Sequence, residues 1–89
     1  MTAYEDWSME VFVAEIDGET DAEARLTSAD SRSFTGRGKA MLNPADRNVA
    51  MIGEEIAIAR AMSDLSHKLL HSAAVGVERM THEKARLHR

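Results

Sequence analysis

The sequence contains no cysteine and a single proline, Pro44. Without cysteine the chain forms no disulfide, no thiolate zinc site and no cysteine nucleophile, and its composition fits a reducing cytoplasm. No stretch approaches the roughly 18 apolar residues that a membrane-spanning helix needs. The first ten residues, MTAYEDWSME, lack the basic region and apolar run of a signal peptide. We therefore expect a cytoplasmic protein that does not enter a membrane.

The 89 residues and the 44% hydrophobic content indicate one globular domain that spans residues 1–89. A chain of this length buries only about 60–65% of its unfolded surface, so its core is marginal and a partner subunit would help. The net charge of −4 argues against strong non-specific binding to nucleic acid.

Alternating apolar and polar residues predict three strands over about 7–16, 21–28 and 33–42. In the first strand Met9, Val11 and Val13 share one face with Trp7, while the other face carries Phe12, Ala14 and Ile16. A strand that is apolar on both faces is usually covered on both. The Asp17-Gly18 pair predicts a tight turn before the second strand, and the SADSRS stretch predicts another before the third.

A helical period follows over about 50–73, with an apolar stripe of Ile58, Met62, Leu65 and Leu69. Residues 75–89 are expected to form a short helix that packs on the sheet, or a tail. The order of elements predicts an α+β fold: a three-stranded antiparallel meander with one long helix across one face.

The third predicted strand contains Gly36-Arg37-Gly38-Lys39, which resembles part of a phosphate-binding loop. The Walker pattern needs a glycine where Ser33 stands and a hydroxyl where Ala40 stands, so we do not expect a nucleotide site. Gly36 and Gly38 lie on the apolar face of the strand. Glycine in a strand often marks the close approach of another element, and we expect the helix to cross here.

Three motifs in the second half resemble the signature of a small actinobacterial family of uncharacterised proteins. They are LNPAD (42–46), IGEEI (52–56) and ARAMSDL (59–65), and THEKARL (81–87) matches the tail of that family. The resemblance implies a fold similar to double-stranded-RNA-binding domains and to ribosome hibernation promoting factors. It also implies dimers, and accumulation of some members under low oxygen or dormancy.

A basic row on the sheet is the first candidate site. Arg37 and Lys39 share one side of the third strand, Arg25 is expected to join them, and Phe12 offers an aromatic face. A basic row beside an aromatic ring is what RNA binding on a sheet requires. The alternative is a solvated face on which the two arginines pair with Glu10 and Glu23 across strands. A basic tail, including Arg79, Lys84 and Arg86, would add contacts to rRNA or would be a frayed end.

The second candidate site is a dimer interface formed by Phe12, Ala14 and Ile16, because an exposed apolar edge strand invites pairing. The alternative is that Val75 and Val77 of the same chain cover these residues.

His67 and His71 lie one helical turn apart, but HKLLH lacks the glutamate of a zinc-protease helix, so we expect surface histidines and no metal. We find no catalytic constellation, cofactor motif or small-molecule substrate site. The family resemblance implies a dimeric, non-enzymatic protein that docks on the ribosome under stress. The alternative is a dimeric protein that binds another protein without an RNA role.

Overall fold

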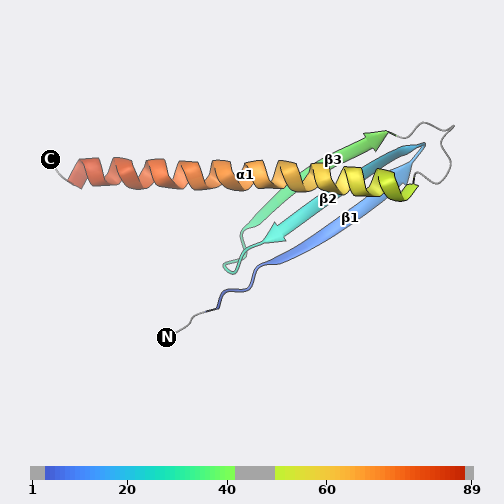
Figure 1. The fold of residues 1–89 in the computed structure, drawn as a ribbon. Coiled ribbons are helices and arrows are strands. Elements are labelled where there is room, and N and C mark those ends of the chain that lie inside the picture. Colours follow the sequence, from blue (N-terminus) through green and yellow to red (C-terminus); the bar gives the residue numbers. More distant parts are fainter. Residues whose placement is uncertain (1–3, 42–49, 88–89) are drawn as a thin grey trace.

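The computed structural model describes residues 4–41 and 50–87, with side chains described for residues 4–41 and 51–82. Three strands, β1 (Ser8–Ile16), β2 (Glu19–Thr27) and β3 (Ser33–Met41), precede one helix, α1 (Ala50–Leu87). The strands form an antiparallel sheet in the order β1-β2-β3. Helix α1 crosses one face of it and continues past its end (Figure 1). We call the face under α1 the inner face and the opposite one the outer face. The predicted α+β meander is confirmed.

The two turns follow from local chemistry. Asp17 and Gly18 both have positive φ, 50° and 78°, which gives the strand-matching twist of a two-residue hairpin turn. In the second turn the Ser28 hydroxyl accepts a hydrogen bond from the Arg32 N–H at 2.9 Å and donates one to Asp30. The Ser28 hydroxyl and then the Arg32 guanidinium lower the pKa of Asp30 below its usual value. Both turns lie where the sequence predicts them.

The core between sheet and helix consists mostly of alanine. The buried apolar residues are Ala22, Ala24, Ala40, Ala57, Ala61 and Leu65. Leu26, Phe34, Ile58 and Leu69 are partly buried around them. The sequence prediction placed larger residues of α1 at the centre, but Met62 is 45% exposed. Such a small core leaves much apolar surface uncovered.

Two glycines explain why alanine fills the core. A Cβ atom built on Gly36 would lie 2.7 Å from Leu65 Cβ, and one on Gly38 would lie 2.7 Å from Arg60 Cβ. Backbone atoms of Ala57 and Ala61 lie at least as close to these two positions. The predicted crossing of the helix over this strand is therefore confirmed. Because the backbones approach so closely, only small side chains fit between them.

The prediction of a separate segment over 75–89 is wrong for the described part of the chain. Helix α1 runs without interruption from Ala50 to Leu87. Gly76 is the one weak helix former near the expected break, and a single glycine costs only about 1 kcal/mol. The distal part of α1 does not pack on the sheet but extends away from it (Figure 1).

Candidate functional site: the edge and outer face of the sheet

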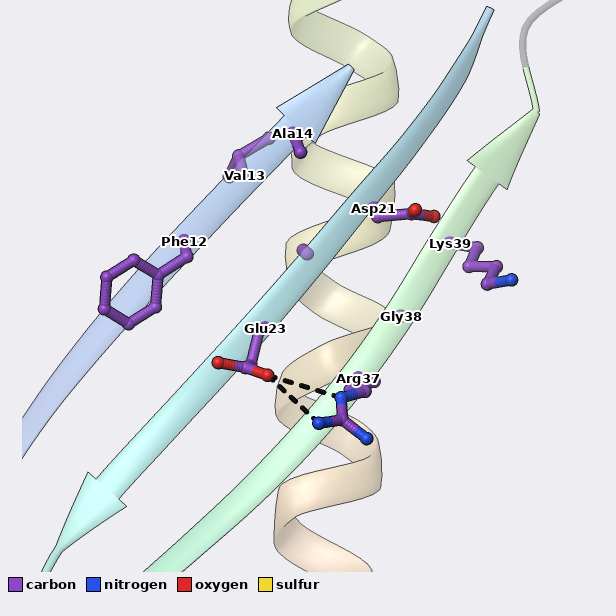
Figure 2. Close-up of a pocket in the computed structure, with 9 residues that line it drawn as sticks. Phe12, Val13, Ala14, Asp21, Glu23, Arg37, Gly38 and Lys39 are labelled. Atoms are coloured by element: carbon purple, nitrogen blue, oxygen red, sulfur yellow. Dashed lines mark hydrogen bonds and ion pairs between the residues drawn. The ribbon is translucent and has the colours of Figure 1, made fainter. Parts of the chain in front are cut away.

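The outer face of the sheet carries a shallow hollow. It has a volume of about 380 Å³, and Phe12 and Ala14 of β1 line one side while Arg37 and Lys39 of β3 line the other. Asp21 and Glu23 of β2 lie between them (Figure 2). The register places Ala14 opposite Asp21 and Phe12 opposite Glu23. The predicted basic row and the predicted apolar row therefore face each other across a central acidic row.

Glu23 is the centre of the charge pattern on this face. Its carboxylate accepts hydrogen bonds from Arg25 at 2.7 Å and from Arg37 at 3.3 Å (Figure 2 draws the latter). The Arg25 guanidinium also lies over the Phe12 ring, 5.2 Å from its centroid. The expected cross-strand pair between Arg37 and Glu23 is present, whereas Arg25 pairs with Glu23 along its own strand and, among the described residues, not with Glu10 across strands. Both arginines therefore converge on this one carboxylate. Lys39 Nζ lies 3.9 Å from Glu19. Each of the three cations of the row therefore lies beside a carboxylate, and the two arginines share theirs.

The basic tail is not brought together with this row. Arg79 belongs to the C-terminal half of α1, and the helix extends away from the sheet toward its C-terminal end (Figure 1). Lys84 and Arg86 belong to α1, but their side chains lie outside the described residues.

Strand β1 is exposed along its whole length, on both faces. On the outer face Phe12 is 46% and Ile16 is 61% exposed. The alternative that Val75 and Val77 cover these residues is wrong, because α1 lies on the opposite face of the sheet. The sequence prediction also missed part of the surface: Met9, Val11 and Val13 on the inner face are each at least 40% exposed. The apolar character of these residues is evident from the sequence. The sequence does not show that the single helix covers β2 and β3 but leaves β1 uncovered.

The backbone of β1 presents hydrogen-bonding groups to solvent. Arg37 N–H bonds to Asp64 of α1, so it points away from β2. In an antiparallel sheet, the backbone N–H and C=O groups of successive residues point to opposite sides of their strand. Arg37, Glu23 and Phe12 lie directly opposite one another on the three neighbouring strands. It follows that Phe12 points its backbone groups toward β2, whereas the N–H and C=O groups of Val11 and Val13 point outward. Within the described part of the chain, no hydrogen bond reaches these outward groups.

An apolar groove adjoins β1 on the inner face. It has a volume of about 350 Å³ and is lined by Met9, Leu26, Met62, Leu65, Ser66, Leu69 and Leu70. The groove exists because α1 lies over β3 and β2 and leaves the inner face of β1 uncovered. The apolar surface of β1 is thus continuous with the flank of the helix.

The histidine pair does not form a reactive cluster with the side chains around it. His67 and His71 are exposed, and His67 Nδ1 lies 2.9 Å from the backbone oxygen of Ser63. Residues 4–41 and 51–82 contain no group of three or more side chains placed to hold a metal ion. Asp64 is engaged by the Arg37 N–H and by Lys68, which in that order lower its pKa below the usual value. No helix among the described residues is both long and apolar enough to cross a membrane.

These features define a small α+β protein with an exposed edge strand and a neutralised outer face. The chain belongs to the Rv2632c-like family, which matches residues 5–86. It is 45% identical over 84% of its length to Rv2632c, an uncharacterized protein of Mycobacterium tuberculosis, and covers 80% of that protein. It is 43% identical to the uncharacterized protein Mb1767 of Mycobacterium bovis, with 91% of this chain and 85% of that protein covered.

A solved structure agrees with this assignment. The crystal structure of Rv2632c superposes with a TM-score of 0.82 at 42% identity, covering 91% of this chain and 95% of that one. The resemblance to a family of small actinobacterial proteins is therefore confirmed at the level of the Rv2632c-like family in mycobacteria.

Proposed function

We propose that this protein is a non-catalytic, dimeric interaction protein whose assembly surface is the free edge of β1. The observation that carries the proposal is the exposure of β1: apolar side chains on both faces, and outward backbone groups with no partner among the described residues. An edge strand of this kind is a template for pairing with another chain. The occupant we propose is a second copy of β1.

Antiparallel pairing of β1 with a second β1 about Phe12 overlaps all nine residues of the strand. Val11 then faces Val13 of the second copy, and the two exchange the backbone hydrogen bonds that are otherwise left to water. Phe12 faces Phe12 of the second copy on the outer face, and such close aromatic pairs stabilise sheets. No like charges face each other in this register, because Glu10 faces Ala14 and Glu15 faces Met9.

The small core supports the same proposal. Among the residues whose side chains the structure describes, the buried apolar ones are five alanines and one leucine, so burial within one chain stabilises the fold only modestly. A six-stranded sheet made from two copies places the inner-face side chains of β1, Met9, Val11 and Val13, between two helices, and it joins the outer-face apolar rows of the two copies. The two α1 helices lie on the same face of such a sheet and stand about four strand spacings apart, so they do not collide.

Sedimentation velocity of two variants at one position tests this proposal. Val11→Pro removes an outward N–H that makes no bond within the sheet, so it blocks edge pairing without breaking the β1–β2 ladder. Val11→Ala shortens the same side chain but keeps the N–H, and serves as the matched control. We expect wild type and Val11→Ala to sediment as dimers and Val11→Pro to sediment as a folded monomer. A Val11→Pro variant that is as dimeric as wild type contradicts the proposal.

A second function, docking on rRNA to restrain translation under stress, is favoured by a different observation. Arg25, Arg37 and Lys39 expose 49%, 75% and 71% of their side chains on one face, and Arg25 lies over Phe12. RNA would have to compete with Glu23 for the two arginines. This is the role that the resemblance to hibernation factors and double-stranded-RNA-binding domains implies.

Co-sedimentation with ribosomes at low and high salt tests the second function. Binding through several phosphates weakens steeply as salt rises. We expect wild type to pellet with ribosomes at low salt and Arg37→Glu/Lys39→Glu to stay in the supernatant. Arg32→Glu, in the turn between β2 and β3, serves as a charge-reversal control that pellets. Wild type that stays unbound at both salt concentrations rules out docking by the isolated protein.

A further inference from the structure

Three side chains of α1 reach the backbone of β3 along its outer edge. The Arg60 guanidinium donates to the Lys39 carbonyl oxygen at 2.6 Å. The Asp64 carboxylate accepts from the Arg37 N–H at 2.9 Å. The Lys68 ammonium donates to the Thr35 carbonyl oxygen at 2.7 Å. We call these three side chains the edge ladder.

The edge ladder works because two spacings match. Residues four apart on a helix are separated by about 6 Å along its axis. Outward backbone groups recur at every second residue of a strand, about 6.6–6.8 Å apart. The chemistry also matches in order, since the two basic side chains meet carbonyl oxygens and the acidic one meets an N–H. Lys68 and Asp64 additionally form an ion pair at 3.0 Å.

The two edges of the sheet are therefore treated differently. On β3 one outward backbone group of each of three alternate residues, Thr35, Arg37 and Lys39, is bonded to α1. On β1 the described residues provide no such bond. Exposed charged contacts of this type add little to stability, so the edge ladder is better explained by what it prevents.

We infer that the edge ladder closes β3 against the addition of a strand, so that β1 is the single edge through which this protein assembles. The claim about the oligomeric state rests on the proposed pairing of β1 with a second copy. Pairing through one edge about a twofold axis ends at two copies, whereas two open edges allow an endless sheet. The edge ladder is then the device that keeps the assembly at a closed dimer.

A double variant on α1 tests the inference. Asp64→Ala/Lys68→Ala frees the Arg37 N–H and the Thr35 carbonyl oxygen, keeps the net charge and places the best helix former at both positions. Glu78→Ala/Arg79→Ala makes the same changes of charge on the part of α1 beyond the sheet, and is the matched control. The measurements are sedimentation velocity over a wide range of protein concentration, and amide hydrogen exchange at Arg37.

We expect wild type and the control to remain dimers with a protected Arg37 amide. We expect the double variant to lose that protection and to form species larger than a dimer that grow with concentration. A double variant that exposes the Arg37 amide yet keeps the oligomeric state of wild type overturns the inference. An Arg37 amide that is unprotected in wild type overturns it as well, because the edge ladder would not be formed.

The two proposals fail in distinguishable ways. If wild type is a monomer while the double variant self-associates, the pairing of β1 is wrong and the closing of β3 stands. If the double variant does not fold, Asp64→Ala alone is measured in the same way, since it frees the Arg37 N–H and leaves the contacts to both carbonyl oxygens. An unchanged state of association in that folded variant overturns the inference.

Discussion

Replacing Gly38 with alanine is expected to destabilise the fold by forcing α1 away from the sheet. The new Cβ would lie 2.7 Å from Arg60 Cβ, and backbone atoms of Ala57 and Ala61 are closer still. Contacts of Cβ below 3.0 Å are essentially never seen, and ordinary contact begins at 3.4 Å. The helix therefore has to move by roughly 1 Å, which loosens its contacts with the alanines of the core.

The magnitude follows from two opposing effects. Forcing extra atoms into a packed site costs about 1–3 kcal/mol. Alanine recovers about 0.5–1 kcal/mol in a strand because it loses less backbone entropy than glycine. Since the obstacle is backbone and not a flexible side chain, we expect the upper part of the first range and a net loss of about 2 kcal/mol. For a domain of this size that lowers the melting temperature by about 8–16 °C.

Thermal unfolding followed by circular dichroism measures this effect, with Gly76→Ala as the matched control. A Cβ on Gly76 meets nothing within 4 Å. Alanine in the interior of α1 is therefore expected to stabilise by about 0.8–1 kcal/mol and to raise the melting temperature. Replacing glycine with alanine is thus expected to destabilise the fold at position 38 and to stabilise it at position 76. A Gly38→Ala variant that melts at or above the wild-type temperature refutes the close packing of β3 and α1.

Two further predictions concern charged residues. Glu23→Gln leaves Arg25 and Arg37 without their carboxylate, so the variant is expected to elute from a heparin column at higher salt than wild type; unchanged elution contradicts the neutralising role of Glu23. Asp64 has a folded-state pKa below its ordinary value of 3.8, so its ionised form stabilises the fold above that pH. This contribution is lost as the pH falls through the folded-state pKa. Asp64→Asn is therefore expected to unfold at lower urea than wild type at pH 7, and the difference is expected to vanish in acid. If the two proteins still differ in their urea midpoints in acid, the stabilisation does not come from the ionised form of Asp64.

The strands and turns were predictable because their signals are local. Alternation of apolar residues set the three strands to within two residues, and the Asp17-Gly18 pair set the hairpin. The close packing on Gly36 and Gly38 was also predictable from the position of the two glycines on the apolar face of the strand. Backbones that approach so closely require small residues on the helix, which favours Ala57 and Ala61 over the larger residues of the predicted stripe.

The candidate site was predictable only in part. The three cations of the outer face and the apolar row of β1 follow from period two, and the structure places both rows as expected. The convergence of two arginines on Glu23 depends on register, which alternation alone does not set. Arg60 and Asp64 lie in the ARAMSDL stretch that carried the family resemblance. Their contact with β3 depends on the position of α1 across the sheet, which no local pattern specifies.

Residue-resolved amide hydrogen exchange of the wild-type protein, measured over a series of concentrations, tests the central claim most directly. The outward N–H groups of Val11 and Val13 lie on the proposed assembly edge, while the Arg37 N–H is closed by α1 within one chain. Protection of Val11 and Val13 is predicted to rise with protein concentration, and protection of Arg37 is predicted to be independent of it. If Val11 and Val13 exchange rapidly in a sample that sediments as a dimer, the copies meet elsewhere and β1 is not the assembly edge.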